Sequence, residues 1–170
     1  MMDFQTISVL LTGVSVSAAA IYYIVTLRAS QKNMRTTLET RQVQLFMQIF
    51  GNFHQTEFFN KYTDILTWKW NDYDDFIQKY GAKTNPKAWY SLGSVGAFFE
   101  GIGVLVHRQL IDVDLVAELM SRHILLFWEK IQPISLEMRK RLQLPVDMRL
   151  EYLYNEIKPI VEKQRMELKM

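Results

Sequence analysis

Apolar residues recur along most of the chain at intervals of three and four, which is the spacing of one face of an α-helix. From Arg28 onward, no stretch alternates apolar and polar residues for long enough to indicate a β-strand. The pattern therefore predicts an all-α protein, with one N-terminal transmembrane helix followed by a compact multi-helix bundle.

The first apolar stretch runs from Ile7 to Leu27 and contains no charged residue. At about 1.5 Å per residue, a helix of this length crosses the roughly 30 Å hydrocarbon core of a bilayer. A secretory signal peptide is the alternative, because Ser15 to Ala20 offers small residues for cleavage, but the preceding segment carries Asp3 and no Lys or Arg. We expect residues 1–27 to form a leader and anchor, and residues 28–170 to form a helical domain.

Basic residues follow this stretch directly, at Arg28, Lys32 and Arg35. Because basic residues beside a span stay on the cytoplasmic side, they predict a single-pass protein of the cell membrane. The N-terminus is then outside, and the domain is cytoplasmic.

Small residues within the span could bring a second membrane helix close. Gly13 and Ser17 lie four residues apart, so they share one helix face. Such a face favours packing against a partner helix, although small residues are common in anchors that have no partner.

Capping residues, glycines and prolines divide the rest of the chain into helices. The first helix is expected to continue from the membrane and to end at Gly51 and Asn52. Further helices are predicted after the caps Thr56, Asp72 (ending at Gly81), Asn85 with Pro86 (ending near Leu110) and Asp112, with a break at Pro133. A last helix is expected from about Asp147, with a kink or restart near Pro159.

The helix that opens at Pro86 is the most apolar one outside the anchor. It contains Gly93, Gly96, Gly101 and Gly103, each of which costs an exposed helix roughly 1 kcal/mol relative to alanine. The glycines therefore predict close packing of the backbone against neighbouring elements. We do not expect a second membrane span, because Glu100 interrupts the apolar run.

Composition excludes several classes of function. The 170 residues include no Cys, which removes thiolate metal sites and redox motifs, and the net charge of +2 is too small to indicate nucleic-acid binding. The three histidines lie far apart, the glycine-rich stretch lacks the lysine of a phosphate loop, and no local Ser, His and Asp cluster is visible. The sequence therefore predicts no catalytic residue, metal site or cofactor, and an enzyme is the less favoured reading.

Glu100 is the charged residue that most needs an explanation, because apolar residues surround it in the sequence. Burying a lone carboxylate costs a large free energy, so a buried Glu100 needs a partner. We predict an ion pair with Arg41 of the first helix. The alternative is a carboxylate with a raised pKa that binds a ligand or transfers a proton in a cleft.

Two surface segments have the composition of partner-binding sites. One combines aromatic rings with carboxylates; aromatic residues dominate interface hot spots, although such rings also fold back onto a core. The other is a basic run, which suits lipid headgroups or an acidic partner but equally a solvated helix face. The candidate partner-binding residues are Trp68, Trp70, Tyr73, Asp74, Arg139, Lys140 and Arg141.

Several stretches resemble one family of proteins. They are ETRQVQLFMQIF (39–50), WNDYDDFIQKYG (70–81), SVGAFFEGIGVLV (94–106), LIDVDLV (110–116), FWEKIQPI and EYLYNE. They are similar to an uncharacterised family of membrane-tethered helical proteins of archaea and bacteria, a domain of unknown function. The resemblance implies a membrane helix and a compact helical domain, and it implies no catalytic residues.

Three functions are consistent with these observations. The leading hypothesis is a non-enzymatic membrane protein whose cytoplasmic domain binds a protein partner, as an accessory or regulatory subunit of a larger membrane complex. The first alternative is an enzyme or small-ligand sensor with a pocket near Glu100. The second is a self-associating membrane scaffold, which leaves a homo-oligomer open.

Overall fold

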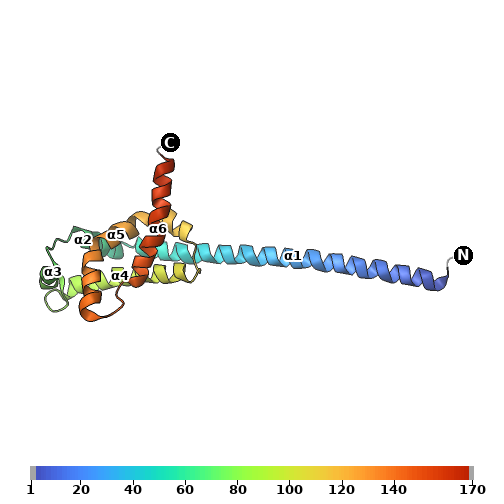
Figure 1. The fold of residues 1–170 in the computed structure, drawn as a ribbon, viewed down its shortest axis with the longest axis horizontal. Helices are drawn as coiled ribbons and strands as arrows, with labels where there is room; N and C mark the ends of the chain where they lie inside the picture. The colour runs from blue at the N-terminus through green and yellow to red at the C-terminus, as the bar shows by residue number, and fades with distance from the viewer. Residues whose placement is uncertain (1–2, 169–170) are drawn as a thin grey trace. The chain divides into compact units, whose positions relative to one another are not determined.

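The computed structural model describes residues 3–168, which form six α-helices and no strand (Figure 1). This confirms the predicted all-α fold with a long apolar N-terminal helix and a helical bundle. The chain divides into two compact units, Met1–Arg41 and Gln42–Met170. The helices are α1 (Phe4–Phe53), α2 (Thr56–Thr67), α3 (Tyr73–Tyr80), α4 (Pro86–His107), α5 (Val113–Leu142) and α6 (Met148–Glu167).

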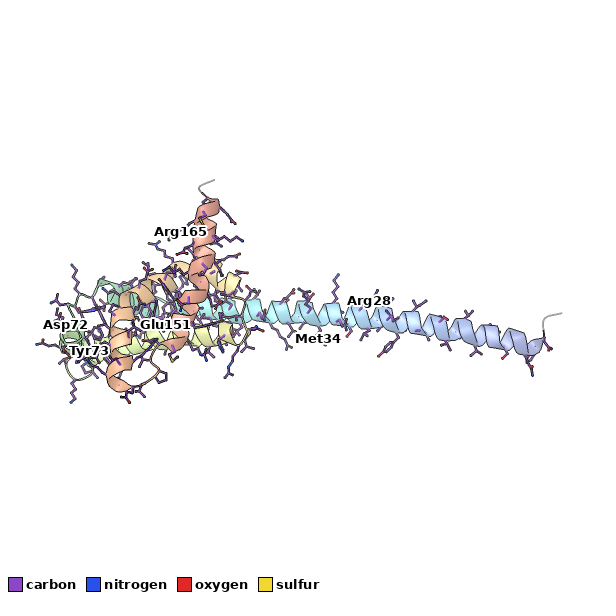
Figure 2. The ribbon with its side chains drawn as sticks, viewed as in Figure 1. Arg28, Met34, Asp72, Tyr73, Glu151 and Arg165 are labelled. Carbon is purple, nitrogen blue, oxygen red and sulfur yellow. The ribbon has the colours of Figure 1, made fainter. Side chains whose placement is uncertain are left out.

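The first unit consists of α1 residues whose described side chains are all exposed. Ile21 and Tyr22, for example, expose 64% and 74% of their surface. After Leu27 the helix continues with mostly polar and basic residues, and Figure 2 labels the basic Arg28 and the exposed, apolar Met34 in this part. The apolar side chains that the structure describes in this unit are thus exposed to solvent.

The second unit buries an aromatic core. The Phe99 ring of α4 lies 5.1 Å from that of Phe127 on α5 and 6.1 Å from that of Tyr62 on α2, between ring centroids. Phe53, near the end of α1, lies 5.7 Å from Phe99 and is also fully buried. Helix α6 packs against both α4 and α5, and α2 packs against α4. Contacts between the consecutive helices α5 and α6, and between helices further apart in the sequence, therefore define this unit.

Three predicted N-caps are confirmed. The carboxylates of Asp72 and Asp112 and the side-chain oxygen of Asn85 each accept a backbone N–H from the first turn of their helix. At α2 the prediction is off by one residue, because the N-cap is Gln55, whose side chain makes no capping bond. Thr56 is instead the first residue of the helix.

The predicted helix ends are less accurate than the caps. Helix α4 ends at His107, before the expected Leu110. Pro133 does not end a helix: α5 continues through it, although the ribbon changes direction along its length in Figure 1. Pro159 likewise lies inside α6. A proline removes one backbone donor, and a helix packed on its neighbours can tolerate that loss by bending.

The four glycines of α4 do not share one role. A Cβ atom at Gly103 would lie 2.1 Å from the Arg149 carbonyl oxygen, so only glycine lets α4 and α6 approach this closely. At Gly96 an added Cβ would make an ordinary 3.5 Å contact with the Asp147 carboxylate. Gly93 and Gly101 face open space, so the prediction of close packing is wrong for these two.

Two of the described helices are long and apolar enough to cross a membrane. They are the Leu11–Phe53 part of α1 and the whole of α4. Of the most apolar stretch of α4, 33% is buried inside the protein, whereas none of the α1 stretch is buried. The apolar composition of α4 is therefore explained by its place in the core, which leaves α1 as the candidate span.

Candidate functional site

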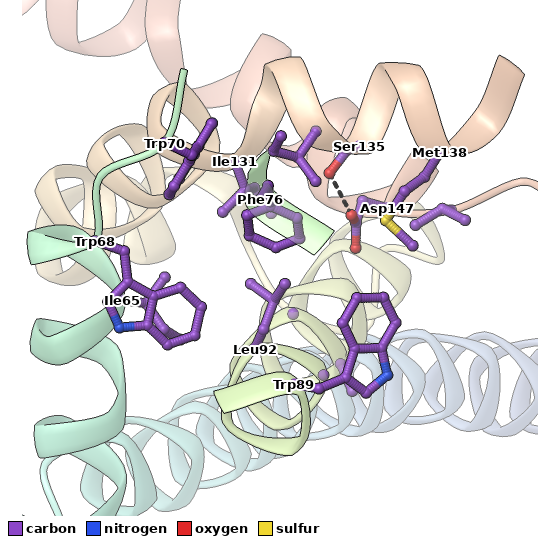
Figure 3. A pocket seen from close by; sticks show the side chains of 15 residues that line it. Ile65, Trp68, Trp70, Phe76, Trp89, Leu92, Ile131, Ser135, Met138 and Asp147 are labelled. Carbon is purple, nitrogen blue, oxygen red and sulfur yellow. Dashed lines mark hydrogen bonds between the residues drawn. The ribbon is translucent and has the colours of Figure 1, made fainter. Parts of the chain in front are cut away.

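The second unit contains a pocket with tryptophan walls, which we call the tryptophan pocket (Figure 3). Its volume is about 140 Å³. Trp68 and Trp70 enter it from the segment between α2 and α3, and Trp89 enters it from α4. The other lining residues are mostly apolar: Ile65, Phe76, Leu92, Gly93, Gly96, Ala97, Ile131, Ile134, Met138 and Val146, together with the polar pair Ser135 and Asp147.

The two predicted partner-binding tryptophans therefore face inward. Trp68 is buried, with 7% of its surface exposed, and its ring stacks on Tyr80 at 4.2 Å between centroids. Trp70 is half-buried, and the Lys130 ammonium lies 4.5 Å from the centre of its ring. The same ammonium donates a hydrogen bond to the Trp68 carbonyl oxygen. These rings fold back onto the core, which is the alternative to an exposed interface hot spot.

A single polar pair forms one wall of the tryptophan pocket. The Ser135 hydroxyl of α5 donates a hydrogen bond to Oδ2 of Asp147 over 2.5 Å, drawn as the dashed line in Figure 3. Ser135 is 2% exposed, and Asp147 is half-buried. Burial raises the pKa of Asp147, whereas the bond from Ser135 and the charge of Arg139 act in the opposite direction. The wall thus carries one carboxylate in mostly apolar surroundings.

Local backbone geometry places Asp147 in this wall. Helix α6 starts close to the predicted Asp147, which is its N-cap residue, but the Asp147 backbone is left-handed (φ 52°) and its side chain makes no capping bond. Asp is one of the few residues that adopt this conformation readily. Its side chain is consequently free to bond Ser135 rather than the first turn of α6.

Glu100 supplies the missing cap of α6. Its carboxylate accepts the backbone N–H of Arg149, in the first turn of α6, over 3.0 Å. Burial raises the pKa of Glu100 and the nearby Asp147 carboxylate adds to the rise, while the Arg149 N–H opposes it. Glu100 is half-buried and does not line the tryptophan pocket. A side chain of α4 thus stabilises the start of α6, beside the close approach at Gly103.

The predicted partner of Glu100, Arg41, is exposed and is the last residue of the first unit. An ion pair between them would join the two units, and it stays a prediction. Arg41 is exposed, whereas a buried ion pair would require its guanidinium to be buried. Loss of such a pair should therefore cost less than a buried pair would.

The predicted basic run is neutralised by the protein's own carboxylates. Arg139 pairs with Glu151 and also donates from Nε to the Val146 carbonyl oxygen over 2.6 Å. Arg141 pairs with Asp74 over 2.6 Å and with Glu137 over 2.8 Å. These partners leave Arg139 and Arg141 little unpaired charge for lipid headgroups.

The remaining candidates lie on the surface. Lys140 is exposed and lies 3.9 Å from a carboxylate oxygen of Glu137. The Arg141 guanidinium lies 4.4 Å from the centre of the Tyr73 ring, which joins Tyr73, Asp74 and Arg141 in one cluster. Whether these residues bind a partner stays a prediction.

The predicted small-residue face of α1 contains a hydrogen bond within the helix. The Ser17 hydroxyl donates to the Gly13 carbonyl oxygen over 2.8 Å within α1. Gly13 is exposed, and no atom lies within 4 Å of an added Cβ. Packing of this face against a second membrane helix stays a prediction.

Sequence reasoning missed three residues of the tryptophan pocket, namely Trp89, Ser135 and Asp147. Trp89 was assigned only to a helix, and Asp147 was assigned only to the start of the last helix. For Ser135 no local signal exists, since its partner lies twelve residues further along the chain.

The fold and the site define an all-α protein with a long apolar N-terminal helix and a small tryptophan-walled pocket in its helical unit. The chain belongs to the family described as a domain of unknown function (DUF4760), which it matches over residues 12–158. That match includes most of α1 and extends into α6, so it covers every lining residue of the pocket. No curated protein and no solved structure matches the chain.

Proposed function

We propose that this chain is a single-pass membrane protein and that its cytoplasmic helical unit binds a protein partner without catalysing a reaction. It acts as an accessory or regulatory subunit of a larger membrane complex. In this proposal α1 is the anchor, and the tryptophan pocket receives one side chain of the partner. The observation that carries the proposal is the size of that pocket.

The volume of a pocket distinguishes a site for one side chain from a site for a whole substrate. Pockets for drug-sized ligands and cofactors have volumes of roughly 300–1,000 Å³. The tryptophan pocket, at about 140 Å³, is close to an engineered cavity of about 150 Å³ that binds benzene. It therefore suits a group the size of one side chain. The alternative enzyme or sensor is less well supported, since Glu100 lies outside this pocket and caps α6.

Exposure of apolar side chains supports the anchor. Along α1, residues such as Val14, Val16 and Tyr23 expose 63–68% of their surface. An uncharged run of this length is stable in a bilayer, where its backbone groups are paired within the helix. The positions of Arg28, Lys32 and Arg35 support a cytoplasmic second unit.

The topology can be tested with introduced cysteines, because the chain has no natural Cys. We expect Asp3→Cys to react with a membrane-impermeant maleimide on intact cells. We expect Lys163→Cys to react only after lysis. The reverse pattern would overturn the cytoplasmic assignment.

Partner binding can be tested by blocking the tryptophan pocket. Gly93 lines the pocket and faces open space, so Gly93→Leu should fill the mouth without a backbone clash. Gly101→Leu is the matched control, because Gly101 lies on the same helix, also faces open space and is outside the pocket. From membranes solubilised in mild detergent, the partner should co-purify with the wild type and with Gly101→Leu but not with Gly93→Leu.

Retention of the same partner by Gly93→Leu would refute the role of the tryptophan pocket. A second copy of this chain as the lost partner would instead favour the self-associating scaffold.

A further inference from the structure

We infer that the tryptophan pocket recognises a primary ammonium group on an unbranched apolar stem and that its occupant is a lysine side chain of the partner. This identification of the occupant rests on the function proposed above. The chemistry of the pocket rests on its own geometry.

The walls of the pocket suit an apolar stem. Three indole rings and several aliphatic side chains line it, and Ser135 and Asp147 are the polar side chains that face the interior together (Figure 3). A lysine side chain has fewer heavy atoms beyond Cα than benzene, and an arginine side chain has more. A volume of about 140 Å³, close to that of a benzene-binding cavity, therefore accommodates lysine better than arginine.

The charges around the pocket select a cation. Asp147 carries the only formal charge among the described lining residues, which include no Lys, Arg or His. Ser135 donates to Oδ2 of Asp147, while Oδ1 lies at the Gly96 wall, 3.5 Å from where a Cβ would be. Oδ1 is therefore the oxygen available to accept from an ammonium group. A ligand carboxylate would instead meet Asp147 without a lining cation to offset the repulsion.

Neighbouring charges strengthen this preference. The Asp147 carboxylate is close enough to Glu100 of α4 to raise the pKa of Glu100 by charge repulsion. The charge of Arg139 of α5 acts on both carboxylates, but Arg139 is already bonded through Nη1 to Glu151 of α6 and through Nε to a backbone carbonyl, and its buried Nη2 has no hydrogen-bond partner. The charges of Asp147, Glu100 and Glu151 thus act on one guanidinium, and an added ammonium would reduce this excess of negative charge.

The protein already places one ammonium group over a tryptophan ring of the pocket. Lys130 lies 4.5 Å from the centre of the Trp70 ring and donates to the Trp68 carbonyl oxygen. Lys130 does not line the pocket, so it leaves the interior free. Indole faces attract cations through their quadrupole, and this attraction grows when water is excluded.

The test uses full-length protein in detergent micelles and three soluble probes of one shape: butylamine, 1-butanol and butyrate. The readout is the indole N–H signals in NMR spectra. Three of the four tryptophans line the pocket, and Trp128, which is buried outside it, serves as the internal reference. Gly93→Leu in the same micelles corrects for partition of the probes into detergent, and Gly101→Leu is its control.

We expect butylamine to shift the signals of Trp68, Trp70 and Trp89 and to bind about tenfold more tightly than 1-butanol. The factor follows from the extra strength of a charge-assisted hydrogen bond. Butyrate should bind more weakly than 1-butanol. In Asp147→Asn, butylamine should fall to the affinity of 1-butanol, whereas 1-butanol binding should stay unchanged.

The pH dependence gives a second test on the unmodified protein. Burial raises the pKa of Asp147, and the charged and polar groups that act on it are Glu100 from α4 and Ser135 and Arg139 from α5. Glu151 of α6 pairs with Arg139. Butylamine stays protonated throughout, so its binding should weaken as the pH falls through this raised pKa, above the ordinary value of about 3.9. Binding of 1-butanol should not change with pH.

Equal affinities for butylamine and 1-butanol at neutral pH would overturn the inference, as would butylamine binding that survives Asp147→Asn. A separate measurement tests whether the occupant is a lysine side chain: butylamine, but not 1-butanol, should release the co-purified partner. Release by neither probe, with butylamine bound, would assign the pocket to a free small amine. If Gly93→Leu retains the partner while butylamine still binds the wild type, the proposed function fails and the chemistry of the pocket stands.

Discussion

Helices α1 and α4 both satisfy the length and hydropathy of a membrane span, yet their surroundings differ completely. None of the apolar stretch of α1 is buried, whereas α4 places Val95, Phe99 and Ile102 in the core with at most 1% exposure. The role of an apolar helix therefore depends on which parts of the protein cover it. Composition alone assigns both helices to the same class.

The glycines of α1 and α4 differ in the same way, in what lies next to them. Gly13 of α1 has no neighbour within 4 Å, while Gly103 of α4 permits the backbone approach of α6. In α4 the glycines also divide by face, since Gly93 and Gly101 are open and Gly103 is not. A glycine thus indicates close packing only when another backbone lies above it.

The largest expected effect tests whether the core depends on α4 and not on α1. Phe99→Ala removes a fully buried ring that has four aromatic neighbours, so it should lower the free energy of unfolding by about 3–5 kcal/mol. Ile21→Ala, in the exposed stretch of α1, should change it by less than about 0.5 kcal/mol. Denaturant unfolding followed by tryptophan fluorescence measures both, because all four tryptophans lie in the second unit. Equal losses for the two variants would contradict the contrast.

The next effect separates two glycines of the same helix. Gly103→Ala would place a Cβ 2.1 Å from the Arg149 carbonyl oxygen and should cost about 1–3 kcal/mol. Gly101→Ala meets open space and should instead stabilise the protein by about 1 kcal/mol through helix propensity. Opposite signs in the same unfolding assay are the expected result. A stabilising Gly103→Ala would show that α4 and α6 are less closely packed than described.

Local signals in the sequence were sufficient for the helical fold and for most helix starts. Asp72, Asn85 and Asp112 cap their helices through bonds within a few residues, so the cap and its partner appear together in the sequence. Pro133 misled the prediction, because the cost of one lost backbone bond is offset by packing that the sequence does not display. The same limit applies to Gly93 and Gly101.

The candidate site was less predictable because its residues come from distant segments. Trp68 and Trp70 were recognised as functional candidates, but their inward orientation depends on Trp89 and on α5. The Ser135–Asp147 pair depends on a left-handed residue that frees a carboxylate from capping. Glu100 was singled out as a carboxylate that needs a partner. The partner that the structure shows is a backbone N–H of α6, which has no side-chain signature in the sequence.

The smallest expected effect concerns Glu100 and asks whether α1 and α4 are energetically coupled. If Glu100 acts as the cap of α6, Glu100→Ala should cost about 0.5–2 kcal/mol, and Glu100→Gln should cost less because an acceptor oxygen remains. Since burial raises the pKa of Glu100, its contribution to stability declines as the pH rises above the ordinary value of about 4.3 and through the raised pKa. Glu100→Gln should remove that decline.

Capping also predicts that the cost of Glu100→Ala is the same with Arg41 present or replaced by alanine, because Arg41 is exposed and the capping bond does not involve it. A double-mutant cycle by denaturant unfolding decides: additive costs within about 0.5 kcal/mol favour the cap alone, and a larger coupling would establish the predicted ion pair between the two helices.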